Sequence, residues 1–232
     1  LVPNWTERNP NGNQLMKIRM GRKLRPIEWI AVAISIVLIV LIGIKAWQLV
    51  QNRTSKLVAP ISSNPLDITF GSDSAQLTIY AYISYHCGYC RLFFTEVYPE
   101  LEREFISNGK VRLVLKIVEH SNNTDRINEV KTAVCINRYG YYGKLHELLV
   151  TNSSVIYSDE FREMVNHFID SDPLVAECIL GNESMDYILQ IRNEFDKFGF
   201  TGTPTFVIEG RVFRGYMPFE QFKSIIVKHL NQ

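Results

Sequence analysis

Two cysteines separated by two residues carry the strongest chemical signal in the sequence, Cys87-Gly88-Tyr89-Cys90. They follow an apolar stretch typical of a buried strand and precede an apolar repeat typical of a helix. If the helix begins near Cys87, its free N–H groups and dipole favour the thiolate over the thiol. Cys90 lies one turn further along, so the two sulfurs can form a disulfide. We predict thiol–disulfide exchange, with Cys87 as the exposed nucleophile and Cys90 as the shielded resolving cysteine.

Two other interpretations of this pair are a disulfide that never cycles and half of a zinc site. Zinc needs three or four ligands, and the sequence has no second Cys-x-x-Cys or close His pair, so we predict no metal. His86 precedes the nucleophile, and as an imidazolium it would stabilise the thiolate. An exposed loop histidine without a role fits equally well. The other histidines are scattered and expected at the surface: His120, His146, His167 and His229.

A second motif, Gly202-Thr203-Pro204-Thr205-Phe206, leads into an apolar stretch. Proline is compatible with the first position of a strand, and a cis bond there would suit a tight approach of two chain segments. By itself this motif is weakly specific.

The elements that must position these residues follow from hydrophobic periodicity and turn signals. Strands are predicted at 68–70, 77–84, 111–118, 205–208 and 211–214. A helix should begin near residue 87, bend at Pro99 and end at Asn108-Gly109. Further helices are predicted at 124–139, 143–150, 159–168, 173–180, 184–198 and from 218 to the end. The order predicts an α/β sandwich with a helical insertion at about 120–198.

Together, the two motifs in this order resemble the thioredoxin-fold disulfide oxidoreductases, over roughly residues 66–230. The helical insertion is similar to that of the DsbA-like branch. The resemblance implies that Cys87 is the nucleophile, Cys90 the resolving cysteine and Pro204 a cis-proline facing them. It also implies that Thr203 offers its backbone to a substrate peptide lying alongside as an added strand.

The sequence departs from the family at two places. Gly88-Tyr89 looks more like the dipeptide of the isomerase DsbC than that of the oxidase DsbA, and this dipeptide tunes the redox potential. Many thioredoxins and DsbA have a buried acidic residue six positions before the first cysteine, where this chain has Ala81. A carboxylate proton relay at that position is therefore absent.

The remaining cysteines, Cys135 and Cys178, lie on two predicted insertion helices. In a reducing compartment both would be buried small apolar residues. In an exported domain they would form a structural disulfide, and some DsbA-like proteins have such a second bridge. We predict the Cys135–Cys178 pairing, because the Cys-x-x-Cys cysteines pair locally.

The first part of the chain differs in charge from the rest. Among 232 residues with a net charge of +1, residues 1–56 have a net charge of +7 and the remainder −6, which argues against nucleic acid as a partner. Residues 29–44 are uncharged, and with the flanking residues to 50 they predict a transmembrane signal anchor, although a cleaved signal peptide is a rival. More basic residues precede this stretch than follow it, so residues 1–28 would be a basic cytoplasmic tail. A start at Met16 or Met20 would make residues 1–15 an artefact.

Residues 51–65 are polar with two prolines and predict a linker to a domain at 66–232. Taken together, these features predict a thiol:disulfide oxidoreductase. It would cross the cytoplasmic (inner) membrane once, with its domain in the periplasm or otherwise outside the cytoplasm. It would form or reshuffle disulfides in unfolded exported proteins with a DsbB-like or DsbD-like redox partner and no cofactor. The alternatives are a Sco-like copper-delivery protein using the same cysteines, and a holdase without redox activity.

Overall fold

The computed structural model describes residues 26–51, 54–56, 60–140 and 142–231. The chain divides into two units, residues 1–48 and 49–232. Helix α1 (Pro26–Gln51) is the described element of the first unit and ends just past its boundary. Residues 1–25 of the predicted tail lie outside the described residues.

The predicted transmembrane anchor is not supported by the structure. The residues concerned form a helix, as expected, within α1. In the described part of the chain, however, no helix is both long and apolar enough to cross a membrane.

The second unit is built on a six-stranded mixed sheet with the order β1-β6-β5-β3-β4-β2. Its strands are β1 (Thr54–Lys56), β2 (Ile68–Phe70), β3 (Leu77–Ile83), β4 (Val111–Ile117), β5 (Thr205–Ile208) and β6 (Arg211–Arg214). The central strands β3 and β4 are parallel, and the other neighbours are antiparallel. Parallel neighbours need a crossover, which the helical segment after Cys87 supplies.

Helices cover both faces of this sheet. On one face, Phe206 of β5 packs against Phe93 of the crossover and Phe222 of α9 (Phe219–Leu230). On the other face, Tyr82 of β3 packs against Phe195 of α8 (Glu183–Lys197). Both side chains of this second contact belong to the same buried core. The core therefore lies on both sides of the sheet, and strand β3 leads from it directly to the cysteine pair.

The crossover is a helical run of four segments: α2 (Gly88–Leu92), η1 (Phe93–Val97), α3 (Tyr98–Leu101) and η2 (Glu102–Ile106). Pro99 lies near the start of α3, and the turn before it widens so that the Tyr98 N–H reaches the Phe93 carbonyl, five residues back. Widened turns of this kind accommodate a residue that lacks an N–H donor. Pro99 thus interrupts the regular helix without ending it.

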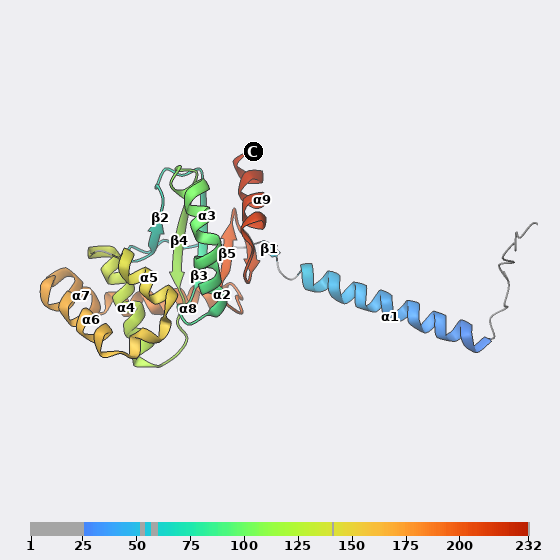
Figure 1. Ribbon diagram of the computed structural model, residues 1–232, viewed down its shortest axis with the longest axis horizontal. Helices are drawn as coiled ribbons and strands as arrows, with labels where there is room; N and C mark the ends of the chain where they lie inside the picture. Colours follow the sequence, from blue (N-terminus) through green and yellow to red (C-terminus); the bar gives the residue numbers. More distant parts are fainter. Residues whose placement is uncertain (1–25, 52–53, 57–59, 141, 232) are drawn as a thin grey trace, which may run out of the picture. The chain divides into compact units, whose positions relative to one another are not determined.

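The predicted insertion is helical, as expected. It contains α4 (Thr124–Tyr139), α5 (Gly143–Thr151), η3 (Ser153–Tyr157), α6 (Asp159–Ser171) and α7 (Pro173–Leu180), followed by α8. In Figure 1 helices α4 to α7 gather beside the β4 and β2 side of the sheet, away from β1. A disulfide joins Cys135 of α4 to Cys178 of α7.

The segment predicted as a linker, residues 51–65, contains structure that the sequence did not indicate. Strand β1 pairs with β6 through Thr54↔Phe213 and Lys56↔Arg211. Further along, Ser62 binds the Glu194 carboxylate through both its backbone N–H and its hydroxyl. This part of the chain therefore belongs to the folded second unit.

Candidate active site

Cys87 lies at the junction between strand β3 and the crossover helix. It is the N-cap of α2, with its carbonyl accepting a hydrogen bond from the Arg91 N–H at 3.1 Å. Its side chain is half-buried, whereas Cys90, one turn on, is 2% exposed. Both are free thiols. The half-buried sulfur at the helix start and the shielded one behind it have the arrangement that exchange chemistry requires.

The surroundings of the two thiols push their acidities in opposite directions. A hydrogen bond from the Cys90 thiol is the main reason that the pKa of Cys87 is lowered, to about 5. The Thr203 side chain and the backbone N–H groups of Cys90 and Tyr89 add to the effect, and burial opposes it. Burial raises the pKa of Cys90 far above its usual range, so Cys90 keeps its proton when Cys87 loses its own.

The second sequence motif meets the first at this point. The Thr203–Pro204 peptide bond is cis, and Pro204 is buried just before β5. When protonated, the Cys87 thiol donates a hydrogen bond to the Thr203 carbonyl oxygen, 3.1 Å from Sγ. Two motifs that lie 116 residues apart in sequence are thus in direct contact.

A cavity of about 350 Å³ opens next to Thr203. Phe195, Phe200, Glu119 and His120 line it together with Ser84, which precedes the cysteine loop. The walls of this cavity are aromatic and acidic. Thr203 connects it to the candidate site.

The dipeptide between the cysteines faces solvent. Tyr89 is 62% exposed, and a Cβ placed on Gly88 would meet no atom within 4 Å. Both positions can therefore contact a partner without changing the protein's own packing.

His86 does not have the environment that either sequence interpretation assumed. Its side chain is 12% exposed, so it is not an exposed loop histidine. Its Nε2 lies 2.7 Å from Oε2 of Glu129 on α4. Burial lowers the pKa of His86, which opposes the predicted imidazolium at neutral pH.

Sequence reasoning missed a group of aromatic residues beneath the cysteine loop. Tyr85 bonds the Tyr142 hydroxyl, and Tyr142 in turn lies 3.1 Å from Nδ1 of His146. His146, expected at the surface, is half-buried and packs edge-on against Phe94 at 4.7 Å between ring centres. Burial lowers the pKa of His146 to about 4. The prediction was wrong because no local pattern distinguishes a histidine that packs against aromatic rings from an exposed one.

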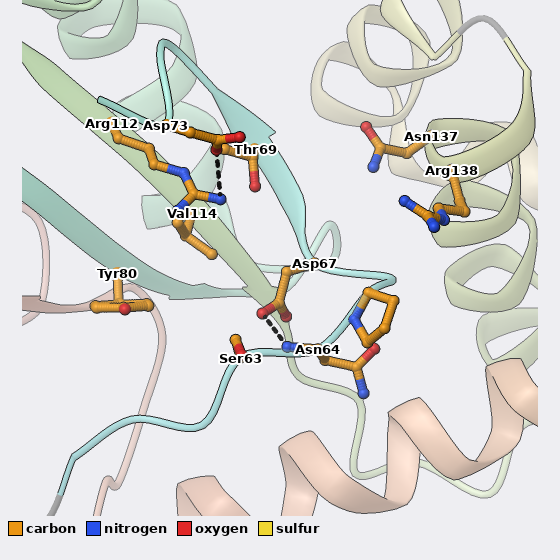
Figure 2. Close-up of a pocket in the computed structure, with 11 residues that line it drawn as sticks. Ser63, Asn64, Asp67, Thr69, Asp73, Tyr80, Arg112, Val114, Asn137 and Arg138 are labelled. Carbon is orange, nitrogen blue, oxygen red and sulfur yellow. Dashed lines mark hydrogen bonds and ion pairs between the residues drawn. The ribbon is translucent and has the colours of Figure 1, made fainter. Parts of the chain in front are cut away.

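A larger polar pocket, of about 440 Å³, lies elsewhere on the second unit (Figure 2). Asp73 pairs there with Arg112 at 3.1 Å, and Asp67 accepts from the Asn64 N–H at 2.9 Å. None of the predicted site residues lines it. Among the described residues, no group of three or more His, Cys, Asp or Glu side chains is arranged to hold a metal ion.

A protein-family model described as Thioredoxin matches residues 63–228. The chain belongs to this thioredoxin family. A putative protein-disulfide oxidoreductase of Rickettsia conorii is 23% identical over 150 residues, which cover 62% of this chain and 53% of that protein. The chain thus spans about half the length of this relative. Disulfide bond formation protein D of Bacillus subtilis is 20% identical over 194 residues, covering 78% of this chain and 86% of that protein.

A solved structure shares the fold of this chain. The structure of α-DsbA1 from Wolbachia pipientis matches with a TM-score of 0.58 and 18% identity, covering 75% of this chain and 94% of that one. The resemblance to DsbA-like members of the family is therefore confirmed, together with the thioredoxin-like fold and its helical insertion. These relatives do not favour the copper-delivery alternative.

Proposed function

We propose that this protein is a DsbA-like thiol:disulfide oxidoreductase whose reacting pair is Cys87 and Cys90. The observation that carries the proposal is the contact of the Cys87 thiol with the Thr203 carbonyl at the cis Thr203–Pro204 bond, beside the buried Cys90. The names of the relatives, a protein-disulfide oxidoreductase and a disulfide bond formation protein, support the same activity.

In the oxidising direction, a substrate thiolate attacks Sγ of Cys87 in the Cys87–Cys90 disulfide. The sulfur–sulfur bond breaks, and Cys90 leaves as a thiolate that takes a proton, because its buried site disfavours charge. A second substrate thiolate then attacks the substrate sulfur of the mixed disulfide. Cys87 leaves as a stable thiolate, the substrate has lost two electrons and the protein has gained them.

The acidity of Cys87 favours this direction over reduction. A stabilised thiolate stabilises the reduced protein, which makes the disulfide a stronger oxidant. A pKa of about 5 lies well below that of an ordinary cysteine. Reshuffling of substrate disulfides would use the same Cys87 thiolate, with Cys90 releasing stalled intermediates.

The substrate would lie along the Thr203 segment, with a side chain in the adjoining cavity. The walls of this cavity combine Phe195 and Phe200 with the acidic Glu119. We therefore expect the substrates to be unfolded chains with apolar residues near their cysteines. Gly88 and Tyr89 would contact these chains or the redox partner. That partner must remove the two electrons in the oxidising direction, as a DsbB-like protein would, or supply them in reduction, as a DsbD-like protein would.

We place the activity outside the cytoplasm, since a disulfide such as Cys135–Cys178 persists where thiols are not kept reduced. Oxidative refolding of a reduced, unfolded ribonuclease tests the function. The wild-type protein should accelerate disulfide formation, and Cys87→Ser should abolish the effect. Cys90→Ser is tested on ribonuclease that already contains scrambled disulfides. Its Cys87 thiolate attacks a substrate disulfide and releases one substrate thiolate, and the mixed disulfide should accumulate because no Cys90 thiol resolves it; mass spectrometry detects it. Full activity in Cys87→Ser would overturn the proposal and favour a holdase.

A further inference from the structure

A buried carboxyl group lies behind the candidate nucleophile, where the sequence indicated none. Glu129 is on the inner face of α4 and its side chain is 1% exposed. Its Oε2 is 2.7 Å from Nε2 of His86, the residue that precedes Cys87. Its other oxygen, Oε1, forms no hydrogen bond with any residue in the described part of the chain.

The loop that carries Cys87 is held mainly by short-range hydrogen bonds. The Cys87 N–H bonds the Ser84 carbonyl at 3.1 Å, and the His86 N–H reaches the Ser84 hydroxyl at 3.3 Å. The His86–Glu129 bond is the contact through which α4 reaches the residue next to the nucleophile.

We propose that Glu129 is a positioning residue of the exchange site, which holds the His86 ring and, by keeping or losing one proton, changes the charge beside the Cys87 thiolate. The inference rests on the proposed function, since it assigns Glu129 a role in that same exchange. Glu129 acts through His86 and does not touch the reacting sulfurs.

Burial explains why this carboxyl group keeps its proton at neutral pH. It is the main cause that raises the pKa of Glu129 to about 8, and the nearby Glu119 carboxylate raises it further. The Arg126 guanidinium, one turn earlier on α4, opposes both. With His86 also neutral, the pair is an uncharged hydrogen bond at neutral pH.

The other titratable groups near Glu129 stay neutral over the same range. Tyr85 comes from the cysteine loop and Tyr142 from the start of α5, and burial raises the pKa of both above the ordinary tyrosine value. Arg126 and Glu119 form an ion pair at 3.8 Å. Loss of the Glu129 proton therefore adds one negative charge in contact with His86, the residue that precedes Cys87.

A negative charge on Glu129 shifts the redox equilibrium of the Cys87–Cys90 pair. When two glutathione thiols reduce the Cys87–Cys90 disulfide, Cys87 becomes a thiolate, Cys90 takes a proton and the glutathiones form their own disulfide. A negative Glu129 disfavours that thiolate, so above about pH 8 the reduced protein is destabilised and the disulfide is a weaker oxidant. Below that pH the proton is present and the effect vanishes.

The test compares glutathione equilibria of the wild-type protein and Glu129→Gln, which keeps a hydrogen bond to His86 but cannot ionise. At about pH 6.5 the two should agree within roughly twofold. At about pH 9 the Glu129→Gln equilibrium should lie about three- to tenfold further toward the reduced protein, equivalent to half to one pKa unit. Ionisation of glutathione affects both proteins equally and cancels. Equal equilibria at both pH values would overturn the proposal.

Two controls separate a positioning role from a general effect on the fold. Glu194→Gln removes another buried carboxylate, on α8, which bonds Tyr82 at 2.6 Å, and should leave the pH profile unchanged. In a His86→Gln background, the substitution Glu129→Gln should change the equilibrium at pH 9 by less than it does in the wild-type background, because the carboxyl group is no longer held by the His86 ring. Additive effects of the two substitutions would contradict action through His86.

If Glu129→Gln does not fold, the wild-type protein still supplies a readout. Carbon-13 NMR of labelled glutamate carboxyls should show one group titrating near pH 8, with a higher midpoint in the reduced protein than in the oxidised one. An identical midpoint in the two states would overturn the inference. A wild-type protein that exchanges with no thiol at all would instead refute the proposed function.

Discussion

The two thiols of the Cys-x-x-Cys pair lie three residues apart and differ in burial and hydrogen bonding. Cys87 is half-buried at a helix start and accepts several hydrogen bonds as a thiolate, while Cys90 is enclosed by the core. A low pKa makes Cys87 both an available nucleophile and a good leaving group at neutral pH. The raised pKa of Cys90 means that, on the proposed mechanism, Cys90 would not compete with Cys87 for the same substrate.

The first prediction concerns this difference. Alkylation of the reduced protein by iodoacetamide across a pH series should show Cys87 reacting with a midpoint near pH 5, because its thiolate is present above that pH. Cys90 should stay unmodified in the native protein. Peptide mass spectrometry after quenching assigns each adduct. A midpoint at the ordinary cysteine value of about 8.5 would contradict the stabilised thiolate.

The sequence predicted the residues of local motifs and missed those brought together by the fold. Cys87, Cys90, Thr203 and Pro204 could be selected because each belongs to a short pattern that carries its own chemistry. The partner of His86 could not, because Glu129 lies 43 residues away on a helix whose polar positions look alike in sequence.

At the level of elements, helix α4 shows why most segments could be predicted. It was expected at 124–139 and is found at Thr124–Tyr139. The Asn123 side chain caps this helix by accepting a hydrogen bond from the Arg126 N–H at 3.1 Å. Strand β1 is the opposite case. Its three residues are all polar and show no alternation of apolar and polar side chains, so the sequence does not indicate a strand there. They form one because they pair with β6.

The disulfide between α4 and α7 gives a prediction at this scale. Cys135 and Cys178 are both buried, and the bridge closes a loop with a sequence separation of 43. The double variant Cys135→Ala/Cys178→Ala should lower the free energy of unfolding by about 4 kcal/mol in the chain-entropy model. Urea unfolding monitored by circular dichroism measures the difference.

The matched control for that measurement is Cys87→Ser/Cys90→Ser, which leaves the bridge intact. Its stability should fall when a reductant is added, whereas that of the alanine double variant should not respond. Equal unfolding curves for the bridged and unbridged proteins would show that α4 and α7 do not depend on the link.

At the level of the whole second unit, a buried cation joins parts of the chain that are far apart in sequence. Lys116 of β4 is fully buried, with Nζ 3.0 Å from Asp67 and 3.7 Å from Glu194 of α8. It also donates to the Ser62 carbonyl. The segment before β2, the central sheet and α8 thus meet at one ammonium group, on the sheet face of Tyr82, which is the register partner of Lys116.

Removal of this ammonium group should therefore destabilise the unit as a whole. Lys116→Met leaves the Asp67 and Glu194 carboxylates buried without a cation, and loss of one partner from a buried pair costs about 3–5 kcal/mol. The more exposed pair of Lys223 and Glu104, at 2.8 Å, provides the control, since water screens it and Lys223→Met should be far less destabilising. Urea unfolding at neutral pH separates the two cases. If Lys116→Met were no more destabilising than Lys223→Met, the segment around Ser62 would be held by its other hydrogen bonds, and Lys116 would not be the link between these elements.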